Sequence, residues 1–263
     1  MSTRTRPQAE PILSARGIVN RFGKQVVHDK LSLDIVPGEI IGIAGGAGSG
    51  KSVLLKTLTG LHEPDAGDVL LDGKAVRTIG AAERASQFGV LFQQGALFSS
   101  LSVAQNITLP MREHTTLPDE EQQRIAAMKL ALAGLTADTG IKPPSALSGG
   151  MVKRAAFARA LALDPKILFL DEPTSDLDPI AASGIDALIL QLNESLGVTV
   201  VIVTHDLTTL FTVCGRIAVM VDKQVTIDTA DKLMKSNHPW IKEFFHGPRA
   251  DGAMQARKTS HGI

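Results

Sequence analysis

The sequence has little of what several protein classes require. Its 263 residues include a single cysteine, Cys214, so neither a disulfide framework nor a cysteine-based zinc site can form, and the chain fits a reducing compartment. Lys and Arg together number 27, as do Asp and Glu, so the formal net charge is zero. That balance argues against a chain-wide electrostatic attraction to nucleic acid or anionic lipid.

Long apolar runs are also lacking. The apolar runs over 200–203 and 217–221 are four and five residues long, whereas a membrane-spanning helix needs about 20 residues. The polar segment 1–10 has no apolar stretch of the signal-peptide kind. We therefore expect no bilayer span in this chain, and any work at a membrane requires partner subunits that supply the spans.

The pattern that is present is that of an α/β domain. With 44% hydrophobic residues at this length, the chain can bury a large core. Strand and helix patterns alternate, with strands expected at 39–44, 167–170 and 198–203, and helices at 52–59, 148–163 and 179–196. This alternation predicts a parallel sheet with helices on both faces.

The N-terminal region departs from that alternation. Leu31, Leu33 and Ile35 alternate with polar residues, which predicts a half-buried strand. The segment 69–76 predicts a hairpin with a type I′ turn at 72–73, where Asp precedes Gly. We therefore expect an antiparallel β portion before the main helical part of the chain.

The stretch from about 95 to 162 has a helical pattern, which predicts an insertion between two sheet strands. A strong helix start at Pro118 is followed by Ile125, Met128 and Leu132 at helical spacing. This spacing predicts a helix that begins near Pro118.

A glycine-rich segment follows the first buried strand and precedes a helix. Its residues fit the pattern G-x-x-x-x-G-K-[ST] and are Gly45, Gly46, Ala47, Gly48, Ser49, Gly50, Lys51 and Ser52. Such a loop turns backbone N–H groups toward one concave anion site at a helix N-terminus. Lys51 can reach the β- and γ-phosphates of a nucleotide, and Ser52 Oγ can ligate Mg²⁺. The alternative is a merely flexible loop, which the strand and helix on either side disfavour.

A second buried strand ends in two carboxylates. Residues 167–170 are apolar, and Asp171 and Glu172 follow at the sheet edge where open α/β folds bind ligands. We expect Asp171 to hold Mg²⁺ through water, and Glu172 to orient and deprotonate an attacking water. The alternative is a strand that ends in an ordinary polar turn, since Pro173 comes next.

Two further segments fit an anion site. His205 follows the apolar strand 201–203, so it lies at the same sheet edge. There it can hydrogen-bond a γ-phosphate or hold Glu172 and the water in line, unless it merely precedes a helix. Ser148 is a natural helix N-cap. Gly149 and Gly150 after it are unfavourable in a first helical turn, which indicates close approach of that helix start to an anion rather than capping alone.

Together these segments resemble the nucleotide-binding subunit of ABC transporters over almost the whole chain. The glycine loop is similar to Walker A and 167–172 to Walker B, while 147–151 is similar to the LSGGQ signature with Met in place of Gln. Gln93 matches the Q-loop and His205 the switch histidine. The segment 175–178 matches the D-loop, with Asp where a small residue is commoner at its second position.

The resemblance implies an α/β fold: a P-loop NTPase core on a parallel sheet, an N-terminal antiparallel β portion and an inserted helical subdomain. It divides the chain into a flexible N-terminus 1–10, an ATPase domain 11–247 with the helical subdomain at about 95–162, and a flexible tail 248–263. It also implies ATP hydrolysis with Mg²⁺ in a head-to-tail dimer of two copies. Each ATP would lie between Walker A of one copy and the signature of the other.

The same resemblance implies roles for single residues. Phe22, 29 residues before Lys51, is expected under adenine, the alternative being a core phenylalanine. Gln93 and His205 are expected to sense the phosphate. The implied catalytic residues are Glu172, His205, Lys51 and Gln93, and the implied Mg²⁺ ligands are Ser52, Gln93 and Asp171. The implied ATP-binding residues are Phe22, Gly45, Gly46, Ala47, Gly48, Ser49, Gly50, Lys51, Ser52, Val53, Ser148, Gly149 and Gly150.

Three segments narrow the resemblance to the ATPase of Mla-type phospholipid transporters: 90–98, the variant at 150–151, and 238–249. That subfamily implies phospholipid transport from the cytoplasmic face of the inner membrane. The implied partners are membrane-spanning permease subunits, a periplasmic lipid-binding subunit and a small cytoplasmic regulator, with no nucleic acid. The uncharged stretch 95–101, with Leu97 and Phe98, predicts a groove for a permease helix.

Other readings stay open at this point. An ATP subunit does not touch the cargo, so an ABC ATPase for another transport substrate fits the same motifs, as does a non-transport ATPase of the iron–sulfur assembly type. A translation or repair ATPase usually carries a second cassette, or zinc or coiled-coil insertions, and this sequence shows none of these.

The segment 237–246 is the most aromatic part of a chain that is only 4% aromatic. A short helix from about Pro239 would place Trp240, Ile241 and Phe244 in one stripe. Two uses of that stripe are open: packing on its own domain, or contact with a neighbouring subunit.

Overall fold

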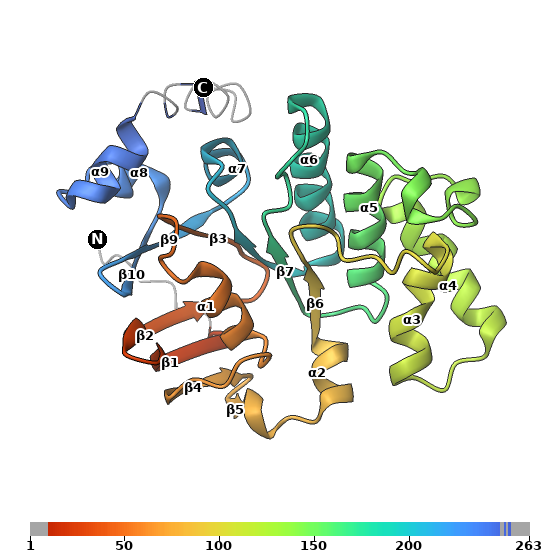
Figure 1. The fold of residues 1–263 in the computed structure, drawn as a ribbon, viewed down its shortest axis with the longest axis horizontal. Helices are drawn as coiled ribbons and strands as arrows, with labels where there is room; N and C mark the ends of the chain where they lie inside the picture. Colours follow the sequence, from red (N-terminus) through yellow and green to blue (C-terminus); the bar gives the residue numbers. More distant parts are fainter. Residues whose placement is uncertain (1–9, 248–249, 251, 254–263) are drawn as a thin grey trace, which may run out of the picture.

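Two β-sheets form the centre of the structure, a computed structural model that describes residues 10–247, 250 and 252–253 (Figure 1). The four-stranded antiparallel sheet has the order β2-β1-β4-β5. Its strands are β1 (Leu13–Phe22), β2 (Gln25–Ile35), β4 (Ala66–Leu71) and β5 (Lys74–Ala75). The predicted hairpin is confirmed, since Asp72 and Gly73 between β4 and β5 have φ of 47° and 78°, as a type I′ turn requires.

The second sheet has six strands in the order β10-β9-β3-β8-β7-β6. These strands are β3 (Ile40–Gly45), β6 (Phe88–Leu91), β7 (Ile167–Asp171), β8 (Thr199–Val203), β9 (Arg216–Val221) and β10 (Gln224–Asp228). All neighbours pair in parallel except β9 and β10. Every residue of β3 and β8 is buried, as expected for strands covered on both faces.

Helices cover both faces of the six-stranded sheet. The α-helices of the structure are α1 (Lys51–Leu58), α2 (Ala81–Gln87), α3 (Val103–His114), α4 (Asp119–Leu132), α5 (Gly149–Ala160), α6 (Pro179–Leu196), α7 (Leu207–Thr212), α8 (Ala230–Leu233) and α9 (Pro239–His246). α1 packs Leu54, Leu55 and Leu58 into the core shared by the two sheets. α5 and α6 pack on the other side against β7 and β8, which confirms the predicted α/β architecture.

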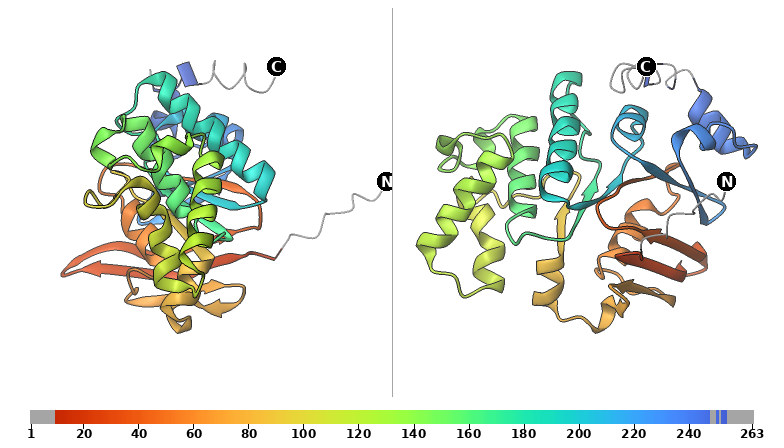
Figure 2. Two further views of the ribbon diagram at one scale, coloured as in Figure 1. Left: turned by 90° about the vertical axis from the view of Figure 1, so that its right-hand side faces the viewer. Right: turned by 180° about the vertical axis from the view of Figure 1, so that it is seen from behind.

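The helices α3, α4 and α5 form a separate apolar cluster, which we call the helical block. Figure 2 shows this block and the antiparallel sheet at opposite ends of the molecule. The predicted helix is confirmed as α4; Ile125 packs against this cluster, Met128 is exposed, and Ala126, Leu130 and even Lys129 are buried. Packing against α3 and α5, rather than the spacing of the largest side chains, selects the buried face.

The C-terminal helix α9 begins at Pro239, as predicted. Its fully buried residues are Ile241 and Phe245, which pack with Leu210 and Phe211 of α7. Trp240 and Phe244 are only partly buried and stack on each other with ring centroids 4.8 Å apart. Of the predicted stripe, Ile241 is fully buried, and Trp240 and Phe244 pack partly buried against the same cluster, so the stripe packs on its own domain.

The predicted chain ends fall largely beyond the described residues. Residues 1–9, 248–249, 251 and 254–263 lie outside them, so the predicted flexible segments and domain limits stay predictions. Ala250 and Ala253 are described and are buried beside α9. Among the helices of residues 10–247, 250 and 252–253, none combines the length and hydropathy needed to cross a bilayer.

Candidate active site

Four adjacent strands bring the predicted motifs to one edge of the six-stranded sheet. In the order β3-β8-β7-β6, the strands run parallel, so their carboxyl ends meet at the same edge. The glycine loop follows β3, His205 follows β8, Glu172 follows β7 and Gln93 follows β6. Segments up to 160 residues apart in the sequence thus form one site.

The glycine loop has a backbone conformation that requires glycine at its last glycine, Gly50. Gly50 caps α1 with φ of 97°, a left-handed conformation that side chains disfavour. A Cβ at Gly50 would lie 2.4 Å from Val27 Cγ1 and 2.6 Å from His28 Nε2. The loop therefore presents bare backbone at the N-terminus of α1, where an anion is favoured.

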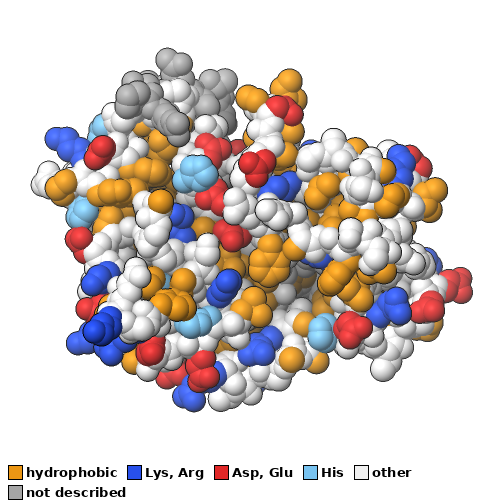
Figure 3. Space-filling view, in the orientation of Figure 1, with side chains coloured by type: hydrophobic (Ala, Val, Ile, Leu, Met, Phe, Trp, Pro, Cys, Tyr) orange, Lys and Arg blue, Asp and Glu red, His pale blue; other side chains and the backbone are white. Residues whose placement is uncertain are grey.

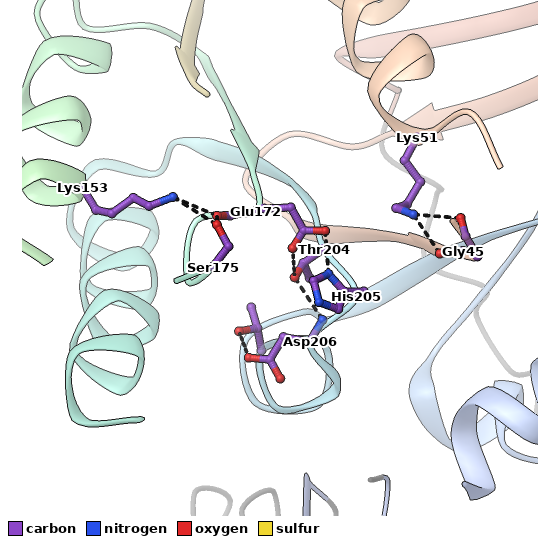
Figure 4. Close-up of polar contacts among 10 residues, drawn as sticks. Gly45, Lys51, Lys153, Glu172, Ser175, Thr204, His205 and Asp206 are labelled. Carbon is purple, nitrogen blue, oxygen red and sulfur yellow. Dashed lines mark hydrogen bonds and ion pairs between the residues drawn. The ribbon is translucent and has the colours of Figure 1, made fainter. Parts of the chain in front are cut away.

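Lys51 places its ammonium group inside this loop. Nζ donates hydrogen bonds to the carbonyl oxygens of Gly45, at 2.8 Å, and Gly46, at 3.1 Å (Figure 4). Burial lowers the pKa of Lys51 from its usual value, and the nearby carboxylates of Glu172 and Asp171 oppose that shift. Ser49 Oγ is buried in the same loop without a hydrogen-bond partner, so the loop holds polar groups that suit a phosphate.

Phe22 stands beside this loop rather than in the core. It is 51% exposed and lines a hollow of about 280 Å³ together with Val27 and the loop residues 48–53. Its ring stacks on His62 with centroids 5.5 Å apart. The core alternative for Phe22 is therefore excluded, and the ring is placed where an adenine could stack on it.

Glu172 is held at both carboxylate oxygens. Thr204 Oγ1 donates to Oε2 at 3.0 Å, and His205 Nδ1 lies 2.8 Å from Oε1, contacts that Figure 4 shows. The Glu172 side chain is 13% exposed, and its backbone has φ of 47°. A non-glycine residue in this conformation stores strain of about 1–3 kcal/mol, a cost that proteins accept mainly at functional sites.

Asp171 lies one residue before Glu172, at the end of β7. Burial, and secondly the charge of Glu172, raise the pKa of Asp171 above its usual value, while Lys153 and Lys51 oppose the shift. A carboxylate that is destabilised in this way suits a cation. No group of three or more His, Cys, Asp or Glu side chains in the described part of the chain could hold a metal by itself.

The signature segment is placed elsewhere on the same chain. Ser148 caps α5 as predicted, with Oγ accepting a hydrogen bond from the Met151 backbone N–H at 3.3 Å. A Cβ on Gly149 would lie 3.4 Å from Leu177, and one on Gly150 would lie 3.5 Å from Ala181. Because α5 and α1 lie on opposite sides of β7 (Figure 1), one chain does not bring the signature to its own glycine loop.

Two polar residues at the site were missed by sequence reasoning. Thr204 contacts the Glu172 carboxylate, and Lys153 donates from α5 to the backbone carbonyl oxygens of Gln93 and Glu172. Thr204 follows a buried strand, as His205 does, so its position was a usable signal. Lys153 had a weaker signal: a lysine beside the largely apolar run 155–158 in the same helix.

A glycine loop between a buried strand and a helix, with carboxylates at a parallel strand end nearby, defines a P-loop ATPase. The ABC transporter family model matches residues 28–175, more than half of the chain. The chain belongs to the ABC transporter family, as its sequence resemblance predicts.

Named relatives agree with that assignment. The intermembrane phospholipid transport system ATP-binding protein MlaF of Haemophilus influenzae is 36% identical over 93% of this chain and 93% of that protein. The probable ribonucleotide transport ATP-binding protein mkl of Mycobacterium leprae is 39% identical over 90% of this chain and 69% of that protein. The ATP-binding cassette MJ0796, solved as a dimer bound to ADP and Pi, matches with a TM-score of 0.75, at 31% identity over 82% of this chain and 98% of that chain.

Proposed function

We propose that this chain hydrolyses ATP to power phospholipid movement by an ABC transporter at the inner membrane. The observation that supports ATP hydrolysis in this proposal is that the glycine loop, His205 and Glu172 lie together at three adjacent strand ends. The phospholipid half is supported by the 36% identity to MlaF over nearly the whole of both chains. The chain would work from the cytoplasmic face, held there by membrane-spanning partners.

ATP would bind along the hollow beside α1. Phe22 would stack on adenine, and the loop from Gly45 to Val53 would surround the phosphates. Lys51 would exchange its two carbonyl contacts for the β- and γ-phosphates, because a doubly charged phosphate group is a stronger acceptor than a carbonyl oxygen. Ser49 Oγ, which has no partner in the chain, would gain one there.

Mg²⁺ fits the donors beside the phosphates. The partly buried carboxylate of Asp171 and the hydroxyl of Ser52 are hard oxygen ligands of the kind Mg²⁺ prefers, and Gln93 would complete the set from the next loop. When bound, Mg²⁺ would neutralise the charge that develops on the transferred phosphoryl group.

Hydrolysis would use Glu172 as the base. Each of its carboxylate oxygens accepts one hydrogen bond in the structure and keeps a second lone pair for a water molecule. Thr204 and His205 would fix the direction of that carboxylate, so that the water is held in line with the γ-phosphate.

The second half of each ATP site would come from another copy of the chain. Ser148, Gly149 and Gly150 form an exposed helix start that no glycine loop of the same chain covers. In a head-to-tail dimer they would supply N–H groups and the positive end of α5 to the far side of the γ-phosphate. The dimeric state of MJ0796 with ADP and Pi supports this arrangement.

The permease would dock on the helical block. A groove of about 470 Å³ runs between β6 and the block and is lined largely by apolar residues, including Phe92, Phe98 and Leu109. Hydrophobic side chains gather over this part of the molecule in Figure 3. Phe98 is exposed, whereas Leu97 packs into two core clusters, so Phe98 is the better contact for a permease helix. A periplasmic lipid-binding subunit and a cytoplasmic regulator would complete the assembly.

The test is reconstitution of this chain in vesicles with candidate permease subunits. We expect ATP-dependent movement of a fluorescent phospholipid between vesicles, and its loss with Phe98→Glu while the isolated chain keeps its ATPase activity. Ribonucleotide transport is the second candidate, because mkl is 39% identical. ATP-driven uptake of a labelled ribonucleotide, without phospholipid movement, would establish that candidate instead.

A further inference from the structure

One buried ammonium group joins three loops of the site. Lys153 projects from α5 with 5% of its side chain exposed. Its Nζ donates to the backbone oxygen of Gln93, to the backbone oxygen of Glu172 at 3.1 Å, and to Ser175 Oγ at 3.4 Å. Figure 4 shows the contacts with Glu172 and Ser175. A lysine ammonium has three N–H donors, so this one has an acceptor for every donor.

These contacts act on the backbone that carries the catalytic carboxylate. Ser175 Oγ also donates to the Glu172 carbonyl, at 2.8 Å, and the Glu172 N–H donates to the carbonyl oxygen of Val203, at 2.8 Å. Both peptide groups of Glu172 are thus fixed while its φ is 47°. Without Lys153 this strained residue keeps fewer contacts, and its carboxylate can leave the position facing His205.

The same side chain links Glu172 to α5 and to the loop at Gln93. Lys153 lies on α5 five residues after Ser148, so the two belong to one rigid helix. Gln93 lies at the start of the loop after β6, and residues of that segment line the groove proposed for the permease. A shift of α5 or of that loop therefore reaches the Glu172 backbone through one ammonium group.

We propose that Lys153 is a positioning residue of the ATPase reaction, which orients Glu172 and makes its orientation depend on α5 and on the loop at Gln93. This role rests on the ATPase activity of the proposed function. It is independent of the transported substrate, so a failure of phospholipid transport leaves it intact.

The chain offers a matched control for this role. Lys129 of α4 is also a buried lysine, 2% exposed, but its ammonium pairs with the exposed carboxylate of Asp164. It has no contact with Glu172, Gln93 or Ser175 among its hydrogen bonds. Replacing either lysine with methionine keeps an apolar side chain and removes the charge. The variants differ in which oxygen atoms lose a hydrogen-bond donor: those around Glu172 for Lys153, and the Asp164 carboxylate for Lys129.

The experiment measures ATP affinity, kcat and melting temperature on the full chain for Lys153→Met, Lys153→Arg and Lys129→Met. We expect Lys153→Met to lower kcat about 10- to 100-fold, as misplacement of a catalytic group does, with ATP affinity within about twofold because Lys51 and Phe22 are untouched. Lys153→Arg keeps the charge and donors and should retain more of kcat. Lys129→Met should keep the parental kcat.

A double-mutant cycle with Ser175→Ala separates positioning from general stability. Lys153→Met and Ser175→Ala should combine non-additively in kcat, because they act on the same carbonyl oxygen, whereas Lys129→Met and Ser175→Ala should combine additively. A folded Lys153→Met chain with the parental kcat, or with ATP affinity lowered as much as kcat, overturns the proposal. If Lys153→Met does not fold, Lys153→Gln is measured against the same two criteria.

Discussion

The carboxyl edge of the six-stranded sheet and the helical block use their polar side chains in different ways. At the edge, Thr204, His205 and Lys153 all direct hydrogen bonds to Glu172. In the block, apolar side chains form the cluster and the buried charge of Lys129 is turned outward to exposed Asp164. The contacts at the edge hold catalytic atoms in position, whereas the packing of the block stabilises the fold. Variants at the edge should therefore change ATP binding or hydrolysis, and variants in the block should change stability.

Glu172→Gln should give the largest effect and should change rate rather than stability. Glutamine keeps the shape of the side chain but cannot take a proton, so kcat should fall about 10²–10⁴-fold while ATP binding and the melting temperature stay close to the parent. Phosphate release and nucleotide binding measure this. The matched control is Glu194→Gln on the exposed side of α6; hydrolysis by Glu172→Gln at the control's rate would show that Glu172 is not the base.

Gly50→Ala should lower ATP affinity, because Gly50 belongs to the glycine loop at the edge and also caps α1. The added Cβ meets Val27 and His28 at 2.4 and 2.6 Å, and φ is 97°, so we expect about a tenfold or greater loss of ATP affinity from strain of about 1–3 kcal/mol. Gly48→Ala is the control: its φ is 74°, but no atom lies within 4 Å of the new Cβ. Equal losses in both would mean that backbone conformation alone, without the clash, limits the loop.

In the helical block, Asp164→Asn should destabilise the fold and leave the ATPase rate per folded molecule unchanged. It leaves the ammonium of Lys129 buried without its anionic partner, at a cost of about 1–3 kcal/mol. Lys129→Met should cost less, because exposed Asp164 is then solvated and an apolar side chain fills the site. Urea unfolding of both variants measures the difference. The reverse order would show that the ion pair itself, rather than the burial of Lys129, sets the cost.

Asp186→Asn should have the smallest effect of these variants, and its effect on the stability of the fold should depend on pH. Thr209 Oγ1 lies 3.0 and 3.2 Å from the two oxygens of Asp186 and 3.1 Å from Asp206 Oδ2. Burial, and to a lesser extent the charge of Asp206, raises the pKa of Asp186 to about 7, while the hydrogen bond from Thr209 opposes this shift. The stability that comes from its proton is full below about pH 4 and is lost as the pH rises to about 7.

Because asparagine cannot lose a proton here, Asp186→Asn should be stabilising at pH 8 relative to the parent, and less so at pH 5. Melting temperatures at the two values test this. An equal shift at both would mean that Asp186 titrates at its ordinary pKa in the folded chain.

Local signals in the sequence were sufficient for much of the fold. The helix over 179–196 has the predicted limits, because Asp178 accepts hydrogen bonds from two N–H groups at its start and Gly197 ends it with φ of 66°. β3 was predicted from an apolar run and a following glycine loop, which are features of adjacent residues. The glycine loop, Glu172 and His205 were located in the same way, since each follows a buried strand.

The spacing of apolar residues alone did not show which side of a helix is buried. It also did not show which side chain contacts two motifs at once. Met128 is exposed on α4 and Lys129 is buried, because neighbouring helices choose the face. Ile241 and Phe245, rather than Trp240 and Phe244, are fully buried because α7 lies on that side of α9.

The sequence by itself determined the glycine loop, the strand-end carboxylates and the alternation of strands and helices, because each depends on residues that are neighbours in the chain. Only the tertiary structure decided that Lys153 reaches Gln93 and Glu172, and that Thr204 contacts the Glu172 carboxylate beside His205. Those contacts join residues up to 60 positions apart. They depend on the order of strands in the sheet and on how α5 packs against it, which no local pattern encodes.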